Sequence, residues 1–396
     1  MKFDESLLYN IKSDYQGIRY SLFDLATWKN GLAFKKIDFS DKGLPVIKIA
    51  ELNNGISSNT SFTQGDYGEE VFVQWDDLLF SWSGNPQTSI DVFRYRLPDG
   101  WLNQHIFKVT ANIELVTKDF LYYTLKYLKP YFTQIATNKQ TTGLGHVTIA
   151  DLKRMSVVIP QKGIQEQITS ILKAIDDKIE VNSNINENLA VLLQTVYQER
   201  FGDGDIAAKQ GVLSDICSYS KDRVAVSELD VTTYFSTENM LPRKAGSTDA
   251  TSLPTTPQTT ACHKGDTLIS NIRPYFKKIV YCEDECGCST DVLCFTPNQP
   301  QYSAYLFSTL YADKFFAFMV AGAKGTKMPR GDKQQIMTYP IVLPSEVALV
   351  EFNTIALPLI KQIYSNRAEN KRLSLLRDTL LPKLMSGELD VSDIDL

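Results

Sequence analysis

The chain has no uninterrupted run of about 18 apolar residues, although 43% of its 396 residues are hydrophobic. Its first ten residues also lack a basic region followed by an apolar stretch. Neither a transmembrane helix nor a signal peptide is therefore predicted. The hydrophobic content is still sufficient for packed cores in two or three domains. We expect a cytoplasmic protein.

Sequence patterns of catalysis are also missing. The chain has three histidines, His105, His146 and His263, which leaves little for acid–base chemistry. No serine lies in a Gly-x-Ser-x-Gly motif, and the glycine-containing segment 325–333 does not fit the phosphate-binding pattern GxxxxGK[ST]. Asn85–Gln87 starts like the Asn-Pro-Pro-aromatic motif of DNA methyltransferases but lacks the second proline and the aromatic residue. No catalytic site is predicted.

Cysteine is absent from the first 216 residues, and a cytosolic setting would keep the six in the second half reduced. Three of them, Cys282, Cys286 and Cys288, follow His263 and invite a zinc interpretation. Their spacing does not give the paired CxxC arrangement of structural zinc sites. The favoured interpretation is a β-hairpin with strands at 277–282 and 289–295 and a turn at 285–287, without a metal. The six cysteines are Cys217, Cys262, Cys282, Cys286, Cys288 and Cys294.

The net charge of −5 is unevenly distributed. Residues 161–206 carry a net charge of −4 and residues 345–396 carry −2, whereas residues 1–160 are neutral and residues 207–344 carry +1. The acidic excess therefore lies in two segments with helical patterns. A neutral module can still bind phosphate if its cations gather on one face.

The chain repeats itself with an offset of about 184 residues. Residues 22–26 match 213–217, residues 77–81 match 266–270, and residues 157–160 match 341–344, always in the same order. The offset of 184 then holds without a gap through a long helical stretch, which pairs Ile179 with Ile363, Asn186 with Asn370, Leu189 with Leu373, Leu192 with Leu376 and Thr195 with Thr379. Such ordered matches indicate an internal duplication.

Each half has the same plan of a globular module followed by a long helix. Short apolar runs between Gly, Asn and Pro turns predict strands, and a helix is predicted at 119–136 in the first module and at 301–320 in the second. The fold class is therefore α/β, with mixed α+β modules. The predicted domains are a first module at 1–160, a central spacer helix at 161–206, a second module at 207–344 and a C-terminal spacer helix at 345–396.

The long helices have the heptad pattern of a coiled coil. In the first helix the heptad positions are Ile168, Ile175, Asn182, Leu189 and Val196, and the intermediate positions include Ile185 and Leu192. Pro358 should kink or delay the second helix. A helix of about 40 residues is about 60 Å long, too long to pack on one module alone. The two copies are expected to pair antiparallel about a pseudo-two-fold axis.

Asn182 and Asn366 occupy equivalent apolar positions near the midpoints of the two helices. In an antiparallel pair the midpoints meet, so these two side chains are expected to face each other. A matched buried pair would satisfy both amides and penalise slipped registers. The alternative is two exposed asparagines at a loosened turn.

With these features the chain resembles the specificity subunit of type I restriction–modification systems, over essentially its whole length. The segments that carry the resemblance are GLPVIKIAELNNG (43–55), LLFSWSGNP (78–86), WLNQHIFKV (101–109), YFSTENMLP (234–242), GDTLISNIRPYFKKI (265–279), PLIKQIYSNRAENKRL (358–373) and LLPKLMSGEL (380–389).

The resemblance implies a non-catalytic, DNA-binding subunit. Each module would be a target-recognition domain for one half of a bipartite site, and the helices would set the distance between half-sites. All four tryptophans lie in the first module, so the modules have diverged and an asymmetric target is expected. DNA methyltransferase subunits and restriction subunits would assemble on this chain, and S-adenosylmethionine, ATP and magnesium would belong to those partners.

Loops beside the predicted strands are the candidates for DNA contact, because loops on a rigid scaffold suit a variable reader. Glycines in the runs 139–146 and 324–330 would permit close approach to phosphate. The candidates in the first module are Ser81, Ser83, Asn85, Asn103, Gln104, His105, Lys139, Gln140, Thr142 and His146. Those in the second are Asn271, Arg273, Lys277, Lys278, Lys324, Thr326, Lys327 and Arg330.

Other functions remain open at the level of sequence. The chain could serve a methyltransferase-only complex without a nuclease. It could also be a fused DNA-modifying enzyme or a coiled-coil scaffold with no role in DNA binding.

Overall fold

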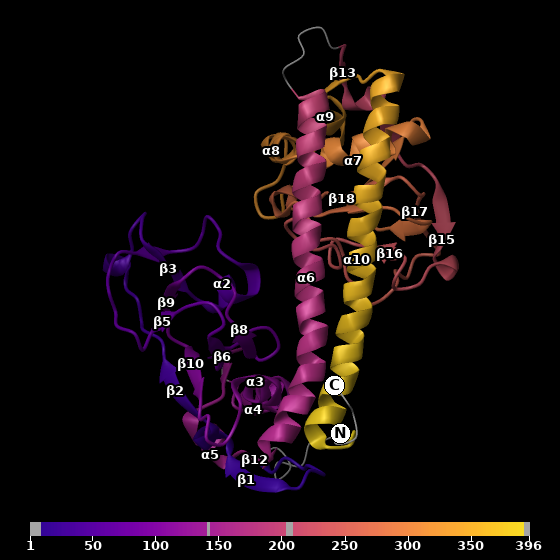
Figure 1. The fold of residues 1–396 in the computed structure, drawn as a ribbon. Helices are drawn as coiled ribbons and strands as arrows, with labels where there is room; N and C mark the ends of the chain where they lie inside the picture. The colour runs from indigo at the N-terminus through magenta and orange to yellow at the C-terminus, as the bar shows by residue number, and fades with distance from the viewer. Residues whose placement is uncertain (1–8, 141–142, 203–208, 392–396) are drawn as a thin grey trace. The chain divides into compact units, whose positions relative to one another are not determined.

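The computed structural model describes residues 9–140, 143–202 and 209–391, and these form two compact units. Unit 1 contains residues 1–177 and 373–396, and unit 2 contains residues 178–372. Each unit thus combines one β-rich module with parts of both long helices (Figure 1). This division differs from the four consecutive domains expected from the sequence, because the helices pack against the modules as well as against each other.

The module of unit 1 is built on a four-stranded antiparallel sheet. Its strand order is β2 (Ala26–Asn30), β10 (Ile106–Ala111), β6 (Leu78–Ser81) and β8 (Asp91–Arg94). Strand β6 is buried throughout, as expected for the apolar run Leu-Leu-Phe in a sheet covered on both faces. A second sheet has the order β4 (Phe62–Thr63), β3 (Leu44–Ile47), β9 (Gly100–Leu102) and β5 (Phe72–Val73).

The module of unit 2 repeats this plan. Its first sheet has the order β14 (Cys217–Tyr219), β21 (Val292–Pro297), β18 (Thr267–Ser270) and β19 (Ile279–Tyr281). These strands correspond one to one, in the same chain and sheet order, to β2, β10, β6 and β8. The second sheet differs, with the order β15 (Arg223–Ala225), β17 (Gln258–Cys262), β20 (Cys286–Cys288) and β16 (Tyr234–Phe235). The predicted repeat is therefore confirmed in the sheets that are central to each module.

A terminal strand pair joins each module to its long helix. In unit 1, β1 (Gly17–Ser21) pairs with β12 (Ser156–Pro160), and in unit 2, β13 (Gln210–Val212) pairs with β22 (Pro340–Val342). Both pairs are antiparallel. The segment that enters each module is therefore held beside the segment that leaves it.

The single helix expected in each module is in fact two helices. In unit 1 these are α3 (Lys118–Tyr127) and α4 (Lys129–Asn138), and α4 starts where Pro130, which has no N–H to donate, occupies its first turn. In unit 2 they are α7 (Ser303–Tyr311) and α8 (Asp313–Ala321), separated by the extended backbone of Ala312. Shorter helices complete the modules: α2 (Ile49–Asn54) and α5 (Ile149–Arg154) in unit 1 and α9 (Lys333–Met337) in unit 2.

The cysteine-rich segment forms neither of the arrangements considered from the sequence. The expected turn at 285–287 overlaps strand β20, which pairs with β17 and β16 instead of closing a hairpin. All six cysteines are buried free thiols, and the sulfur atoms of Cys282 and Cys286 lie 3.5 Å apart. Within residues 9–140, 143–202 and 209–391, no group of three or more His, Cys, Asp or Glu side chains is arranged to hold a metal ion.

The long helices are α6 (Lys162–Phe201) and α10 (Glu346–Ser386). Pro358 does not delay α10, which begins twelve residues before it and continues past it. In unit 2 the two helices run antiparallel and side by side (Figure 1), as the 2.8 Å ion pair between Arg200 and Glu351 shows. In unit 1 an antiparallel contact joins Asp176 to Arg377 at 2.9 Å. The expected antiparallel pairing is thus confirmed within each unit.

The heptad prediction is correct for some positions and wrong for others. Ile168, Ile175 and Asn182 are buried as predicted, but Ile185 and Leu192 are 40% and 47% exposed. Near its C-terminal end α6 turns a different face inward, because it must cover the module of unit 2 as well as α10. The buried side chains there are Leu193, Tyr197 and Phe201, which belong to the core that contains Phe352 and Ile360 of α10.

Asn182 and Asn366 are both buried, but their hydrogen bonds differ from the expected bond between the two. The Asn182 amide nitrogen donates to Asn370 Oδ1 at 2.9 Å, and the Asn366 amide nitrogen donates to Asn186 Oδ1 at 2.9 Å. By the offset of 184, these bonds are equivalent to each other. The pseudo-two-fold axis therefore passes between residues 182 and 186, and each asparagine meets the residue four positions beyond the expected partner.

One described helix, α10, contains a stretch long and apolar enough to cross a membrane by length and composition alone. Core helices pass the same test, and Phe352, Ala356 and Ile360 of this stretch of α10 are buried in the core of unit 2. Packing in the core thus accounts for part of its apolar character.

Candidate nucleic-acid interface

In unit 1, two short strands bring together loops that lie more than 60 residues apart. The strand β7 (Ser83–Gly84) follows β6 after one residue and pairs with β11 (Gly145–His146), with Ser83 opposite His146. The hydroxyl oxygen of Ser83 lies 3.4 Å from Nδ1 of His146. Two residues that were predicted separately thus form one site at the end of β6.

Trp82, which was not predicted, organises the side chains of this site. Its ring centroid lies 5.2 Å from that of His105 and 6.5 Å from that of His146. Its indole nitrogen donates to Asn30 Oδ1 at 2.9 Å, and its ring stacks on Phe107 at 5.6 Å. A tryptophan between two candidate serines was a visible signal in the sequence, but only the fold shows that it gathers both histidines.

Unit 2 has the same loop pair at the equivalent place. Ile272 forms an antiparallel bridge with Arg330, and the sequence offsets of 189 and 184 make these residues the counterparts of Ser83 and His146. Arg273 N donates to Pro329 O at 2.8 Å, and Gly331 N donates to Asn271 O at 3.2 Å. The loop after β18 is thus bound to the loop before α9, as the loop after β6 is bound to the loop before α5.

Two predicted contact residues are buried and therefore not available to DNA. Ser81 is fully buried as the last residue of β6, and Asn271, next after β18, is 7% exposed. Ser81 Oγ and Asn271 Oδ1 have no hydrogen-bond partner within the described residues. The prediction was wrong here because the sequence does not show where the buried part of a strand ends and its loop begins.

Several predicted cations are already bound to other groups. Lys139 lies 2.5 Å and 2.6 Å from the carboxylate oxygens of Asp151, whose side chain is 1% exposed. Burial alone would raise the pKa of Asp151, but the hydrogen bonds from Lys139 and Thr148 lower it below its ordinary value. Lys139 is thus the counter-ion of a buried carboxylate, and its predicted contact with DNA is not supported.

In unit 2, Lys278 is also bound within the protein, because its ammonium group donates a hydrogen bond to Thr237 O at 2.5 Å. Burial lowers the pKa of Lys278. The remaining paired cations stay accessible. Lys277 contacts Asp313 at 2.9 Å, Lys324 contacts Asp332 at 2.5 Å, and Arg330 contacts Asp291 at 3.2 Å. The Lys324 and Arg330 side chains are 82% and 51% exposed, so a phosphate could replace or share these surface partners.

The other candidates differ in accessibility. Asn85 is exposed, but its side-chain oxygen accepts the backbone N–H groups of Gln87 and Thr88 and so caps a turn. Asn103 and Arg273 are half-buried, and Thr142 lies outside the described residues. The other exposed candidates are Gln104, His105, Gln140, Thr326 and Lys327.

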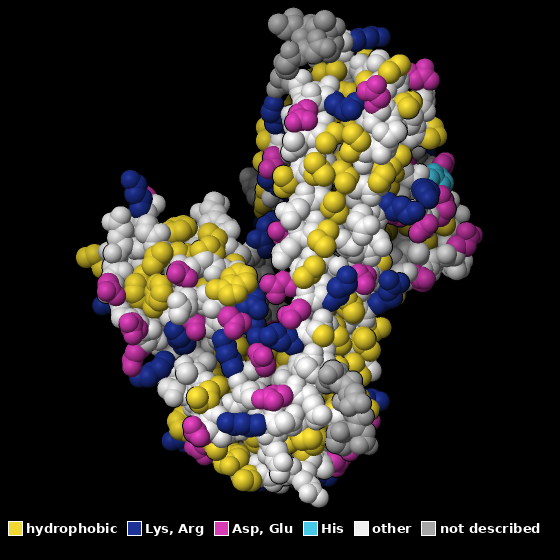
Figure 2. All heavy atoms as spheres, viewed as in Figure 1, with side chains coloured by type: hydrophobic (Ala, Val, Ile, Leu, Met, Phe, Trp, Pro, Cys, Tyr) yellow, Lys and Arg dark blue, Asp and Glu magenta, His cyan; other side chains and the backbone are white. Residues whose placement is uncertain are grey.

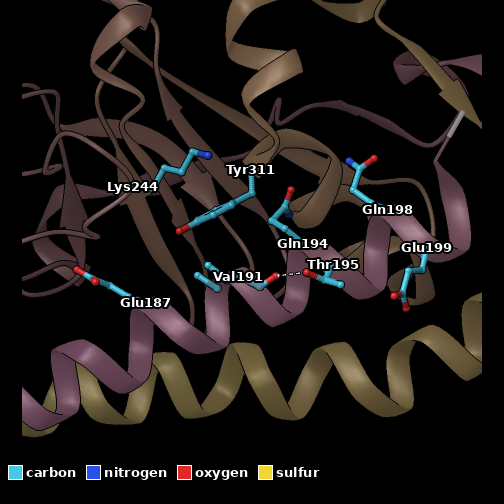
Figure 3. Close-up of a pocket in the computed structure, with 9 residues that line it drawn as sticks. Glu187, Val191, Gln194, Thr195, Gln198, Glu199, Lys244 and Tyr311 are labelled. Atoms are coloured by element: carbon cyan, nitrogen blue, oxygen red, sulfur yellow. Dashed lines mark hydrogen bonds between the residues drawn. The ribbon is translucent and has the colours of Figure 1, made fainter. Parts of the chain in front are cut away.

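An open groove of about 590 Å³ lies elsewhere in unit 2, between α6 and the module (Figure 3). Its lining includes Val191 and Thr195 of α6 together with Lys244 and Tyr311. The Lys244 ammonium lies over the Tyr311 ring at 4.5 Å from the centroid. This groove has no convergent set of catalytic side chains among its lining residues.

Comparisons with known proteins agree with this architecture. Residues 18–190 match the family model of the type I restriction modification DNA specificity domain. Among curated proteins, the type I restriction enzyme HindI specificity subunit of Haemophilus influenzae is 29% identical over 143 residues, which is 34% of this chain and 31% of that protein. The MjaIX specificity subunit of Methanocaldococcus jannaschii is 34% identical over 76 residues, 19% of this chain and 18% of that protein.

The match thus spans less than a third of the length of these relatives. Among solved structures, the type I restriction–modification S subunit from M. genitalium superposes with a TM-score of 0.57 at 16% identity, over 96% of this chain and 98% of that one. The two therefore share a fold. The resemblance to specificity subunits inferred from the sequence is confirmed, because both curated relatives are named as specificity subunits of type I restriction enzymes.

Proposed function

We propose that the chain is the DNA-reading specificity subunit of a type I restriction–modification complex, with one half of a bipartite, asymmetric site read by each module. The observation that supports this most is the recurrence of one loop pair, Ser83 with His146 and Ile272 with Arg330, at the end of equivalent strands. The same scaffold thus presents different side chains in the two modules, as two readers of different half-sites require.

The partners and cofactors follow from this proposal. The long helices expose apolar side chains outside the groove of Figure 3, among them Val347 at 69%, Val350 at 57% and Leu375 at 70%, and Figure 2 shows apolar patches along the helices. Such patches mark protein-interaction surfaces, so DNA methyltransferase and restriction subunits would dock there. S-adenosylmethionine, ATP and magnesium would be bound by those subunits, and the helices would set the spacing of the half-sites.

The test is to map methylated adenines in genomic DNA from cells that express the complete system with this chain intact or deleted. His146→Ala should relax base preference in one half-site and Arg330→Ala in the other, each by about 1–3 kcal/mol of discrimination. The matched control is Arg223→Ala, an exposed arginine whose guanidinium bonds to Thr260 and Gln258 on strand β17.

If both variants altered the same half-site, or if methylation did not depend on the chain, the proposal would be wrong. Whether the complex also contains a nuclease is decided by the subunits that co-purify with the tagged chain. The names of the relatives favour a restriction enzyme over a methyltransferase-only complex.

A further inference from the structure

A three-residue turn in unit 2, η5 (Pro274–Phe276), directs two aromatic side chains to the solvent. Tyr275 is 50% exposed and Phe276 is 39% exposed, and their ring centroids lie 4.8 Å apart. The turn is closed by backbone hydrogen bonds from Phe276 N to Arg273 O and from Lys277 N to Pro274 O, both 2.9 Å. Two adjacent exposed rings are an unusual use of large apolar side chains on the surface of a module.

Two neighbouring loops hold this turn in place. On one side, Arg243 N donates to Phe276 O at 2.7 Å and Lys244 N donates to Lys277 O at 2.9 Å. On the other side, Arg273 N donates to Pro329 O at 2.8 Å. The aromatic turn is therefore bound to the loop pair of the candidate interface, and its backbone is fixed before any ligand arrives.

The residues that frame the turn have left-handed backbones. In the described part of unit 2, the non-glycine residues with positive φ are Arg243, Lys244, Arg273 and Lys277, at 56°, 62°, 50° and 53°. Residues other than glycine rarely adopt this conformation, and such residues cluster at binding sites where the surrounding structure enforces it. All four are basic, although the chain as a whole has a net charge of −5.

Of these four cations, the two arginines are available to a phosphate. The two lysines, Lys244 and Lys277, share the carboxylate of Asp313, at 2.7 Å and 2.9 Å. Arg243 is exposed and Arg273 is half-buried, and neither guanidinium has an ion-pair partner within the residues that the structure describes. Arg273 directly precedes the turn and Arg243 is bonded to it through Phe276 O, so two arginines flank the aromatic turn.

We propose that the Tyr275–Phe276 turn reads a thymine in the half-site of the second module, by apolar contact with its 5-methyl group in the major groove. This inference rests on the proposed function. The bases of an intact duplex are already stacked, so the thymine methyl is the apolar group that the major groove offers to an aromatic ring. A rigid turn can contact this methyl group while the bases stay stacked. A side chain inserted as a wedge between two base pairs would instead have to unstack them, which costs free energy.

The test uses the full-length chain assembled with its methyltransferase subunits and duplexes that carry the site mapped as described above. Each thymine of either half-site is replaced singly by deoxyuridine, which keeps the base pair and removes the methyl group. At one position in the second half-site, the affinity of the wild-type complex should fall about fourfold, the value of one buried methyl group. The variant Tyr275→Ala/Phe276→Ala should bind the thymine duplex about tenfold more weakly and should not distinguish thymine from uracil there.

Two controls make the result specific. Trp75→Ala removes another exposed ring, 59% accessible, in the first module, and should leave the uracil effect in the second half-site unchanged. Phe276→Leu keeps an apolar side chain at the turn and should keep part of the thymine preference, which guards against a variant that only unfolds the loop.

The possible failures are distinguishable. If the wild-type complex did not prefer the mapped site over a scrambled duplex, the proposed function would fail whatever the turn does. If that preference held but no uracil substitution in the second half-site mattered, or if Tyr275→Ala/Phe276→Ala remained sensitive to uracil, the thymine contact would be wrong. Fluorescence enhancement of 2-aminopurine beside the turn on binding would also overturn it, in favour of a wedge.

Discussion

At the level of single residues, ion pairing decides which side chains of the candidate interface can reach DNA. Lys139 and Lys324 are adjacent in the aligned repeats, yet one neutralises a carboxylate that is 1% exposed and the other a carboxylate that is 22% exposed. Removing Lys139 would leave Asp151 buried without its counter-ion, whereas removing Lys324 would free a surface group. Loss of DNA binding in a Lys139 variant would therefore report on folding rather than on contact with phosphate.

The four asparagines that bond across the long helices, here called the asparagine layer, give a prediction at the same scale. They are Asn182, Asn186, Asn366 and Asn370. Replacing Asn182 and Asn366 by alanine should destabilise unit 2 by about 1–3 kcal/mol, because Asn370 and Asn186 lose their hydrogen-bond donors and two buried sites become cavities. Denaturant unfolding of the full chain measures this. Asn184→Ala, an exposed change on the same helix, should alter stability by less than about 0.5 kcal/mol. Equal effects of the two changes would show that the layer has no special role.

At the level of elements, the contacts between α6 and α10 are symmetric about residue 184 of α6 and residue 368 of α10. The equivalent bonds Asn182–Asn370 and Asn186–Asn366 lie on either side of these two residues. A change in the length of one helix alone would therefore displace every layer beyond it. A change that keeps the heptads must be made in both helices at equivalent places.

Inserting seven residues after Asn184 in α6 and seven after Ala368 in α10 should preserve the packing and lengthen both helices by about 10 Å. If the helices set the spacing of the half-sites, the spacer in the DNA site should grow by about three base pairs while the half-site bases stay the same. Methylation mapping reads both quantities. An unchanged spacer with a folded protein would contradict the role of the helices as a ruler, and the single insertion in α6 serves as the misfolding control.

At the level of the whole molecule, each module depends on chain segments that are distant in sequence. Tyr15 Oη donates to Leu384 O at 2.7 Å, and Asp14 N donates to Ser386 O at 2.7 Å. Leu384 and Met385 belong to the same buried core as Leu22 and Ile168. The first module is therefore completed by the end of α10, and its exchangeable part is smaller than residues 1–160.

Exchanging residues 22–155 for those of another specificity subunit, while keeping β1, β12 and the end of α10, should change one half-site and leave the other intact. The reason is that the terminal strand pair and the contacts at 384–386 all stay native. Exchange of the whole of 1–160 should give a less stable chimera, seen as a lower melting temperature, because the Tyr15–Leu384 contact is then not matched. Altered bases in both half-sites of the first chimera would rule out independent reading by the modules.

Local sequence patterns were enough to predict the duplication, the two long helices and the family resemblance. These follow from local periodicity and from the comparison of one half with the other, and neither requires knowledge of long-range contacts. The sequence also identified the segments that form the loop pairs, since glycines and polar residues beside buried strands mark loops. It placed Asn182 and Asn366 in the buried face because the heptad is a local pattern.

Which of the predicted side chains are exposed and unpaired depends on contacts that form only in the folded chain. The burial of Ser81 and Asn271, the pairing of Lys139 with Asp151 and the exposure of Tyr275 depend on neighbours that are distant in the chain. Ile185 and Leu192 are exposed because this part of α6 packs against both α10 and the module of unit 2, which buries a different face of the helix. The hydrogen-bond partners of Asn182 and Asn366 depend on where the pseudo-two-fold axis crosses the helices. That position is set by the packing of α6 against α10 and not by the sequence of either helix alone.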